Sequence, residues 1–118
     1  FNKKKTIDYD LAWEAILKRK PASPKNVPGA FVDFDNAPRH GENAKIYAEA
    51  TPQKFEKYFS QLIKKTKDVY KKDYIFLTAW NEWAESSYLE PDKKFEYGYL
   101  EAVRNALVAN GEFPSEDK

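Results

Sequence analysis

Three stretches of this chain carry apolar residues at the spacing of an amphipathic helix. The first covers about residues 10–20 and ends at Pro21, and the second begins at Thr51-Pro52, which supplies a cap and a proline at the first helical position. The third ends at Asn110-Gly111. The apolar positions are Tyr9, Trp13, Ile16 and Leu17, then Phe55, Phe59, Leu62, Ile63, Thr66, Val69 and Tyr70, then Leu100, Val103 and Leu107. We therefore predict three helices.

Two short runs between these helices have the composition of buried strands. Residues 74–77 are aromatic or branched apolar side chains, and residues 30–34 alternate apolar and polar side chains around Asp33. A buried carboxylate needs a partner, and we expect Arg39 or Arg104 to pair with Asp33. Residues 1–6, 41–50 and 111–118 show no clear periodicity, so we expect a frayed start, an irregular connection and a loose tail.

The order helix, strand, helix, strand, helix is typical of an α/β fold with parallel crossovers. Two strands cannot form a parallel sheet that is covered on both faces, so further strands must come from elsewhere. We predict a single domain, ordered at about residues 9–110, that is the carboxyl-terminal portion of a (β/α)8 barrel with its other units upstream of Phe1. The alternative is a small independent α/β domain with strands in segments predicted here as loop or helix.

Composition excludes several classes of partner. The chain has 118 residues, with 20 basic and 19 acidic side chains and a net charge of +1, which argues against a nucleic-acid-binding surface. It has no cysteine and one histidine, so we expect no disulfide, no metal site built on those ligands and no cofactor. Because no apolar run approaches the roughly 20 residues that cross a bilayer, we predict a soluble chain and a cytoplasmic location.

Polar and aromatic residues follow the second predicted strand abruptly. Residues 80–85 place two carboxylates, a carboxamide and two indoles at the carboxyl end of that strand. Carboxylates transfer protons, an amide fixes hydroxyl groups, and indole faces stack on the C–H faces of a pyranose. Surface glutamates and packing tryptophans are the ordinary alternative. The residues predicted to contact or transform a carbohydrate here are Trp80, Asn81, Glu82, Trp83 and Glu85.

The spacing of Glu82 and Glu85 imposes a condition on the backbone. Along an extended strand these two residues would be roughly 10 Å apart and on opposite faces. One helical turn would bring their side chains within about 5 to 6 Å of each other. We therefore predict that the strand ends near Asn81 and that the chain then curls.

A second polar cluster, consisting of Asp35, Asn36 and Arg39, follows the first predicted strand. These residues could bind substrate hydroxyls or a phosphate, although Asp and Asn before a proline are also common turn residues. Glu90 is a further candidate for the same cleft, and pairing with Arg39 is its alternative role. Both clusters lie at carboxyl ends of strands, where barrel enzymes carry their chemistry.

In this order, the motifs resemble the carboxyl-terminal part of the WbsX-type glycosyltransferases of bacterial surface-polysaccharide and lipopolysaccharide biosynthesis. That family is similar to the barrels of glycoside hydrolase family 99. The resemblance covers about residues 9–110. It rests on Asp35-Asn36-Ala37-Pro38-Arg39, Thr51-Pro52, the segment 79–85 and Leu89-Glu90-Pro91-Asp92. It implies a barrel fold and a carbohydrate substrate.

The hydrolase branch of the family has two glutamates three residues apart, which correspond to Glu82 and Glu85. The resemblance implies retaining hydrolysis of a mannoside, in which Glu82 deprotonates the sugar's own 2-hydroxyl and Glu85 protonates the leaving oxygen. Where the family usually has glycine after the second glutamate, this chain has Ser86-Ser87. A positive φ at that place would be strained.

These observations predict a carbohydrate-active domain and leave its reaction open. A transferase needs a pocket for a nucleotide-sugar or lipid-linked donor, yet the four glycines form no phosphate-binding loop. This favours the acid and base steps of a hydrolase resembling an endo-α-mannosidase, in contrast to the family's name. The alternative from another class is a sugar-binding or assembly module without turnover.

Overall fold

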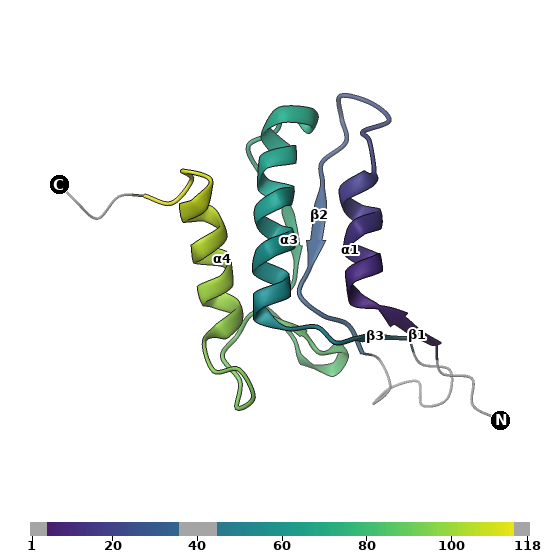
Figure 1. Ribbon diagram of the computed structural model, residues 1–118, viewed down its shortest axis with the longest axis vertical. Helices are drawn as coiled ribbons and strands as arrows, with labels where there is room; N and C mark the ends of the chain where they lie inside the picture. Colours follow the sequence, from purple (N-terminus) through teal and green to yellow (C-terminus); the bar gives the residue numbers. More distant parts are fainter. Residues whose placement is uncertain (1–4, 36–44, 115–118) are drawn as a thin grey trace.

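The described part of the chain, residues 5–35 and 45–114 of a computed structural model, contains three α-helices and three two-stranded sheets. The helices α1 (Tyr9–Lys18), α3 (Pro52–Lys65) and α4 (Gly98–Ala109) lie side by side, and β2 (Gly29–Phe31) runs between α1 and α3 in Figure 1. The predicted α/β class is confirmed. Within the described residues, none of the helices is both long and apolar enough to span a membrane.

Side-chain caps fix where the first two helices begin. The Asp8 carboxylate and the Thr51 hydroxyl each accept a hydrogen bond, at 3.1 Å, from the backbone N–H three residues ahead. Helix α3 continues as a π-helical turn, η2 (Thr66–Tyr70), which ends where Lys71 takes a φ of 56°. The predicted long helix is confirmed, but its helical type changes at the end. Val69, predicted to lie on the buried face, is 46% exposed because the wider turn shifts the register.

An aromatic core lies between α1, α3 and β2. Trp13 is fully buried, and its ring stacks on Phe31 and Tyr58 at centroid distances of 5.7 and 5.8 Å. The Tyr9 hydroxyl donates a hydrogen bond to the Val32 carbonyl at 2.8 Å, which ties the start of α1 to the end of β2. The predicted apolar stripes of the first two helices therefore face this core.

Helix α4 packs on α3 through a face that differs slightly from the predicted one. Its buried residues are Tyr99, Ala102 and Ala106, while Leu100, Val103 and Leu107 are half-buried. Gly98 begins the helix close to Pro52, where a Cβ atom on the glycine would lie 2.9 Å from the proline ring. Small residues thus allow the two helices to approach closely.

The strands β2 and β4 (Phe76–Thr78) pair in parallel, with Ala30 opposite Leu77. A hydrogen bond from Val32 N to the Thr78 carbonyl, at 3.0 Å, continues the ladder beyond the strands. Both strands were predicted from the sequence, but the predicted burial of the second is wrong, because Tyr74 is 50% and Phe76 is 66% exposed. Because they are parallel, the polar segments that follow them leave the same edge of the sheet.

Two further strands lie in segments that we predicted to be frayed or irregular. β1 (Lys5–Asp8) and β3 (Lys45–Ala48) pair in parallel, with Ile7 opposite Tyr47. Each has only one or two large apolar residues, too few for an alternating pattern to be recognised. Their partners lie in a different part of the sequence, so no local pattern could reveal the pairing.

Part of the segment predicted to be a loose tail packs on the helices. Glu112 forms an ion pair with Lys67 at 2.6 Å, and its N–H donates to the Leu107 carbonyl at 2.8 Å. The guanidinium of Arg104 lies over the Phe113 ring, 5.6 Å from its centroid. Arg104 therefore contacts this segment rather than Asp33, its predicted partner.

Candidate functional site

The segment after β4 folds into a small hairpin. β5 (Asn81–Glu82) pairs antiparallel with β6 (Ser87–Tyr88), and the 3₁₀ helix η3 (Trp83–Glu85) connects them. The Trp80 carbonyl accepts hydrogen bonds from the N–H groups of residues 89 and 90, each at 3.1 Å, which closes the base of the hairpin. The predicted curl is therefore present, but it begins at Trp83 rather than near Asn81.

Ser86 completes the turn in a left-handed conformation. Its φ is 55° and its ψ is 23°, and its N–H donates to the Trp83 carbonyl at 3.1 Å. This is the residue after the second glutamate, where the sequence raised the question of a positive φ. A side chain in this region of backbone space is disfavoured relative to glycine. The hairpin thus contains one strained residue beside Glu85.

Asp35, from the second predicted polar cluster, contacts the hairpin through the backbone. The Asp35 N–H donates to the Glu85 carbonyl at 2.8 Å, and the Ser87 hydroxyl donates to the Asp33 carbonyl. Asp35 also forms an isolated antiparallel bridge with Ile46 of β3. The ends of β2 and β4 and the middle of β3 are consequently joined at one place.

The predicted catalytic glutamates lie on either side of the turn. Glu82 is exposed in β5, and Glu85 is half-buried at the end of η3. Glu82 has a φ of -84° and a ψ of 69°, so it lies outside the 3₁₀ helix that contains Glu85. Trp80, which precedes the hairpin, is 52% exposed, and Asn81 is exposed as well.

Trp83 is held in place from two sides. Its indole Nε1–H donates to Glu90 Oε1 at 2.8 Å, and its ring stacks on Tyr88 with a centroid distance of 3.8 Å and an interplanar angle of 17°. The Tyr88 hydroxyl in turn donates to Asp92 Oδ2 at 2.7 Å, while Asp92 Oδ1 accepts the Phe95 N–H at 2.6 Å. One chain of contacts therefore fixes the ring, although 48% of Trp83 stays exposed.

Several predicted contacts involve residues outside the described part of the chain. Glu90, for which we considered pairing with Arg39, accepts a hydrogen bond from Trp83. Asn36 and Arg39 lie outside the described residues, so their predicted roles stay predictions. Tyr88 and Asp92 were not predicted as site residues. Tyr88 directly precedes the motif that ends at Asp92, and the spacing of four between the two residues was the sequence feature that could have indicated their contact.

Asp33 lies half-buried between the hairpin and α4. Burial raises the pKa of its carboxyl to about 6, and repulsion from Asp35 adds to the rise. A hydrogen bond from the Phe34 N–H, at 2.7 Å, lowers the pKa and so opposes this rise. Burial and the hydrogen bond to Asp92 likewise raise the pKa of Tyr88 to about 12. The Asp33 carboxyl therefore takes up a proton closer to neutral pH than an exposed aspartate would.

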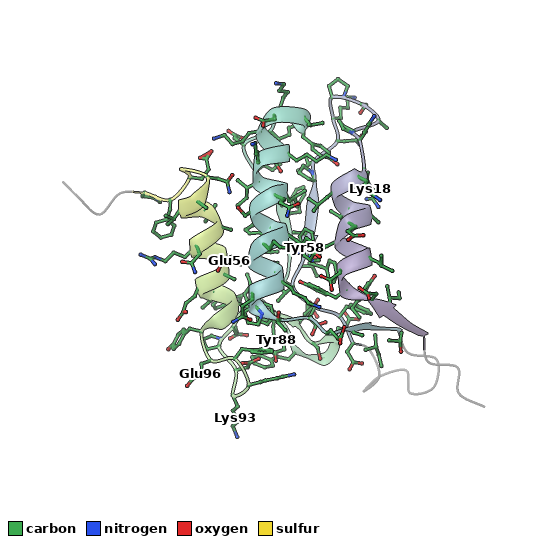
Figure 2. All side chains as sticks on the ribbon, viewed as in Figure 1. Lys18, Glu56, Tyr58, Tyr88, Lys93 and Glu96 are labelled. Atoms are coloured by element: carbon green, nitrogen blue, oxygen red, sulfur yellow. The ribbon has the colours of Figure 1, made fainter. Side chains whose placement is uncertain are left out.

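A shallow hollow of about 520 Å³ lies beside the hairpin. Figure 2 shows Tyr88 below the helical layer and Lys93 at the tip of the loop that precedes α4. Neither Glu82 nor Glu85 lines this hollow. Among the residues that the structure describes, no group of three His, Cys, Asp or Glu side chains is placed to hold a metal ion. The lining residues are Trp83, Tyr88, Pro91, Asp92, Lys93 and Lys94.

One family and two relatives match this sequence. The family model described as Glycosyltransferase WbsX matches residues 1–103. The chain is similar to protein WxcX of Xanthomonas campestris pv. campestris, with 32% identity over 106 residues in strain ATCC 33913 and 33% over 85 residues in strain B100. These matches cover 83% and 69% of this chain but only 15% and 12% of the relatives' own lengths. No solved structure matches.

Proposed function

Because this chain belongs to the WbsX glycosyltransferase family, we propose that it is a carbohydrate-active domain that acts on glycosidic bonds in bacterial surface-polysaccharide or lipopolysaccharide biosynthesis. In this proposal it forms the carboxyl-terminal portion of a (β/α)8 barrel, and further units supply the remaining strands. The parallel pairing of β2 and β4 supports this architecture. Both polar segments follow carboxyl ends of parallel strands, where barrel enzymes carry their active sites.

Glu82 and Glu85 are the proposed catalytic pair. Glu82 acts as the base that removes a hydroxyl proton, and Glu85 acts as the acid that protonates the leaving oxygen. Their positions at the two ends of one short connection, Glu82 before η3 and Glu85 at its end, support this pairing. The residues proposed to bind the carbohydrate are Asp35, Asn36, Arg39, Trp80, Asn81, Trp83 and Glu90.

The proposal depends most on the hydrogen bond from Asp35 N to the Glu85 carbonyl, at 2.8 Å. This bond holds the turn that carries Glu85 against the segment after β2. A substrate bound over the hairpin would therefore lie close to Asp35 as well. This contact between residues 50 positions apart in the sequence supports the proposal that one substrate reaches both segments.

Carboxamide variants test the catalytic pair directly. In the protein as its gene encodes it, Glu85→Gln and Glu82→Gln should each lower the rate of sugar transfer or release by about 10²- to 10⁴-fold, since each removes a proton-transfer group. Binding of the oligosaccharide should change little. Glu101→Gln, on the exposed side of α4, is the matched control. An undiminished rate in Glu85→Gln would remove that residue from the mechanism.

A donor titration separates the two possible reactions. If the domain is a transferase, a nucleotide-sugar or lipid-linked donor should raise the melting temperature, because a ligand that binds only the folded state stabilises it. If the domain is a hydrolase resembling an endo-α-mannosidase, an α-mannoside should be cleaved without any donor. The absence of a thermal shift at saturating donor would argue against transfer.

A sugar-binding module without turnover is the second candidate. The exposure of Glu82 favours it, because catalytic carboxylates usually act where water is excluded. Such a module should retain oligosaccharide while producing no transfer or release with any donor or glycoside. Any turnover that Glu85→Gln abolishes would refute this candidate.

A further inference from the structure

The hollow beside the hairpin has a rigid aromatic wall. Trp83 and Tyr88 stack at 3.8 Å, and each ring is also held at its polar atom, Trp83 by Glu90 and Tyr88 by Asp92. A surface indole that is half exposed gains little from burial, so these contacts fix its orientation rather than remove it from water. A ring held in this way suits stacking against an apolar ligand face, because little conformational freedom is lost on binding.

The lining of the hollow also includes cationic side chains. Lys93 and Lys94 both line it, and within the described residues neither forms an ion pair. The nearby acids already have partners, because Glu90 accepts the Trp83 indole N–H and both Asp92 oxygens accept hydrogen bonds. The Lys94 ammonium lies 5.0 Å from the centroid of the Phe95 ring instead. Lys94 also lies near enough to the Asp33 carboxyl to lower its pKa, so Lys93 is the ammonium group of this lining for which the described residues show no carboxylate partner.

Building on the proposed carbohydrate function, we infer that this hollow binds a pyranose that carries an acidic group, either a carboxylate or a phosphate. The C–H face of the sugar lies on Trp83, and the acidic group points toward Lys93 and Lys94. An ammonium is a point charge on a flexible stem, so it can accept either anion. Tyr88 and Asp92 act as positioning residues that hold the stacking surface.

Three sugars that differ only at carbon 6 test this inference. They are methyl glucoside, methyl glucuronide and methyl glucoside 6-phosphate, and they present a hydroxyl, a carboxylate and a phosphate. The indole N–H signal of Trp83 in the NMR spectrum, assigned by its loss in Trp83→Phe, reports binding to the 118-residue chain. At low salt, an acidic sugar should bind about fivefold more tightly than the neutral one, and salt should reduce that preference. The acidic sugar that binds more tightly identifies the acidic group.

Paired lysine variants test whether Lys93 and Lys94 cause the preference for an acidic sugar. Lys93→Gln combined with Lys94→Gln should abolish it while changing the affinity for methyl glucoside less than about twofold, because stacking is retained. Lys18→Gln combined with Lys64→Gln removes the same charge from exposed positions on α1 and α3 and should keep the preference. An equal loss in this control would mean that net charge, rather than the hollow, selects the acid.

The inference and the proposed function fail in different ways. Equal affinity for all three sugars, or no shift of the Trp83 signal with any of them, overturns the inference and leaves the catalytic pair to its own test. Turnover that survives the changes at Glu82 and Glu85 overturns the catalytic proposal. In that case the preference of the hollow for an acidic sugar would still stand.

Discussion

The helical core and the hairpin both contain stacked aromatic rings, but they use these rings differently. Trp13 is fully buried between Phe31 and Tyr58, whereas Trp83 stacks on Tyr88 and leaves 48% of its surface exposed. Trp13 gains free energy because its apolar surface leaves water. Trp83 is oriented by the hydrogen bond from its indole N–H to Glu90 and by its stacking on Tyr88. The comparison indicates that the core rings stabilise the fold, while the hairpin rings are held in a fixed orientation at the surface.

Truncation of Trp13 and of Trp83 should give the largest difference in the free energy of unfolding between the core and the hairpin. Trp13→Ala should lower the free energy of unfolding by about 3–5 kcal/mol, because it leaves a cavity in the core. Trp83→Ala should lower it by less than about 1 kcal/mol, as expected for a residue near the surface. Urea denaturation followed by circular dichroism measures both.

Leu11→Ala is the control for the core truncation, because Leu11 lies on the same helix and is 63% exposed. It should be close to neutral. If Trp13→Ala does not fold, Trp13→Phe leaves a smaller cavity and should still destabilise the chain more than Trp83→Ala does. An effect of Trp83→Ala as large as that of Trp13→Ala would place the hairpin within the core and remove the contrast.

The next largest effect concerns the contacts that hold the hairpin rings. Asp92→Ala removes the acceptor for the Tyr88 hydroxyl and for the Phe95 N–H, and should cost about 1–2 kcal/mol. The indole N–H signal of Trp83 should also shift and broaden, since its stacking partner is released. Asp92→Asn keeps an acceptor and should have a smaller effect, and Asp73→Ala alters an exposed loop aspartate. An unchanged Trp83 signal in Asp92→Ala would show that Asp92 does not position the ring.

The core was the more predictable of the two regions because its pattern is local. Side chains three and four positions apart in α3, such as Phe55, Phe59 and Leu62, are buried as their spacing predicted. The register was wrong only where the helical type changed, at Val69. β1 and β3 were missed because their short segments become strands only by pairing with each other.

Of the features of the hairpin, only the curl of its backbone was predicted from the sequence. The hypothesis that Glu82 and Glu85 act together predicted a curl between them, and the structure has one at Trp83. The hydrogen bond between Asp35 and Glu85 joins two segments distant in sequence, which periodicity cannot indicate. Composition likewise gave no reason to pair Glu90 with an indole.

Asp33 should make stability depend on pH at the boundary between the two regions. Its pKa is about 6 in the folded chain, above the ordinary 3.8, so the folded state binds more protons between these values. Stability should therefore fall as pH rises from about 4 to 7, by about 1 kcal/mol once solvent screening of this partly exposed carboxyl is considered. Between these pH values, the urea concentration at the midpoint of unfolding should fall less in Asp33→Asn than in the unchanged chain. Asp73→Asn should retain the whole fall, and identical profiles for both variants would contradict the assignment to Asp33.

The smallest expected effect is at Ser86, where the hairpin backbone is strained. Ser86→Gly should raise the free energy of unfolding by about 0.5–1 kcal/mol, because relief of the left-handed conformation exceeds the entropic cost of glycine. Ser86→Ala keeps a Cβ atom and should give no gain, so it separates backbone relief from loss of the hydroxyl. A gain in both variants would attribute the strain to the side chain instead. If Ser86→Gly stabilises the chain but lowers turnover, the left-handed serine positions Glu85; unchanged turnover would mean that the strain only closes the hairpin.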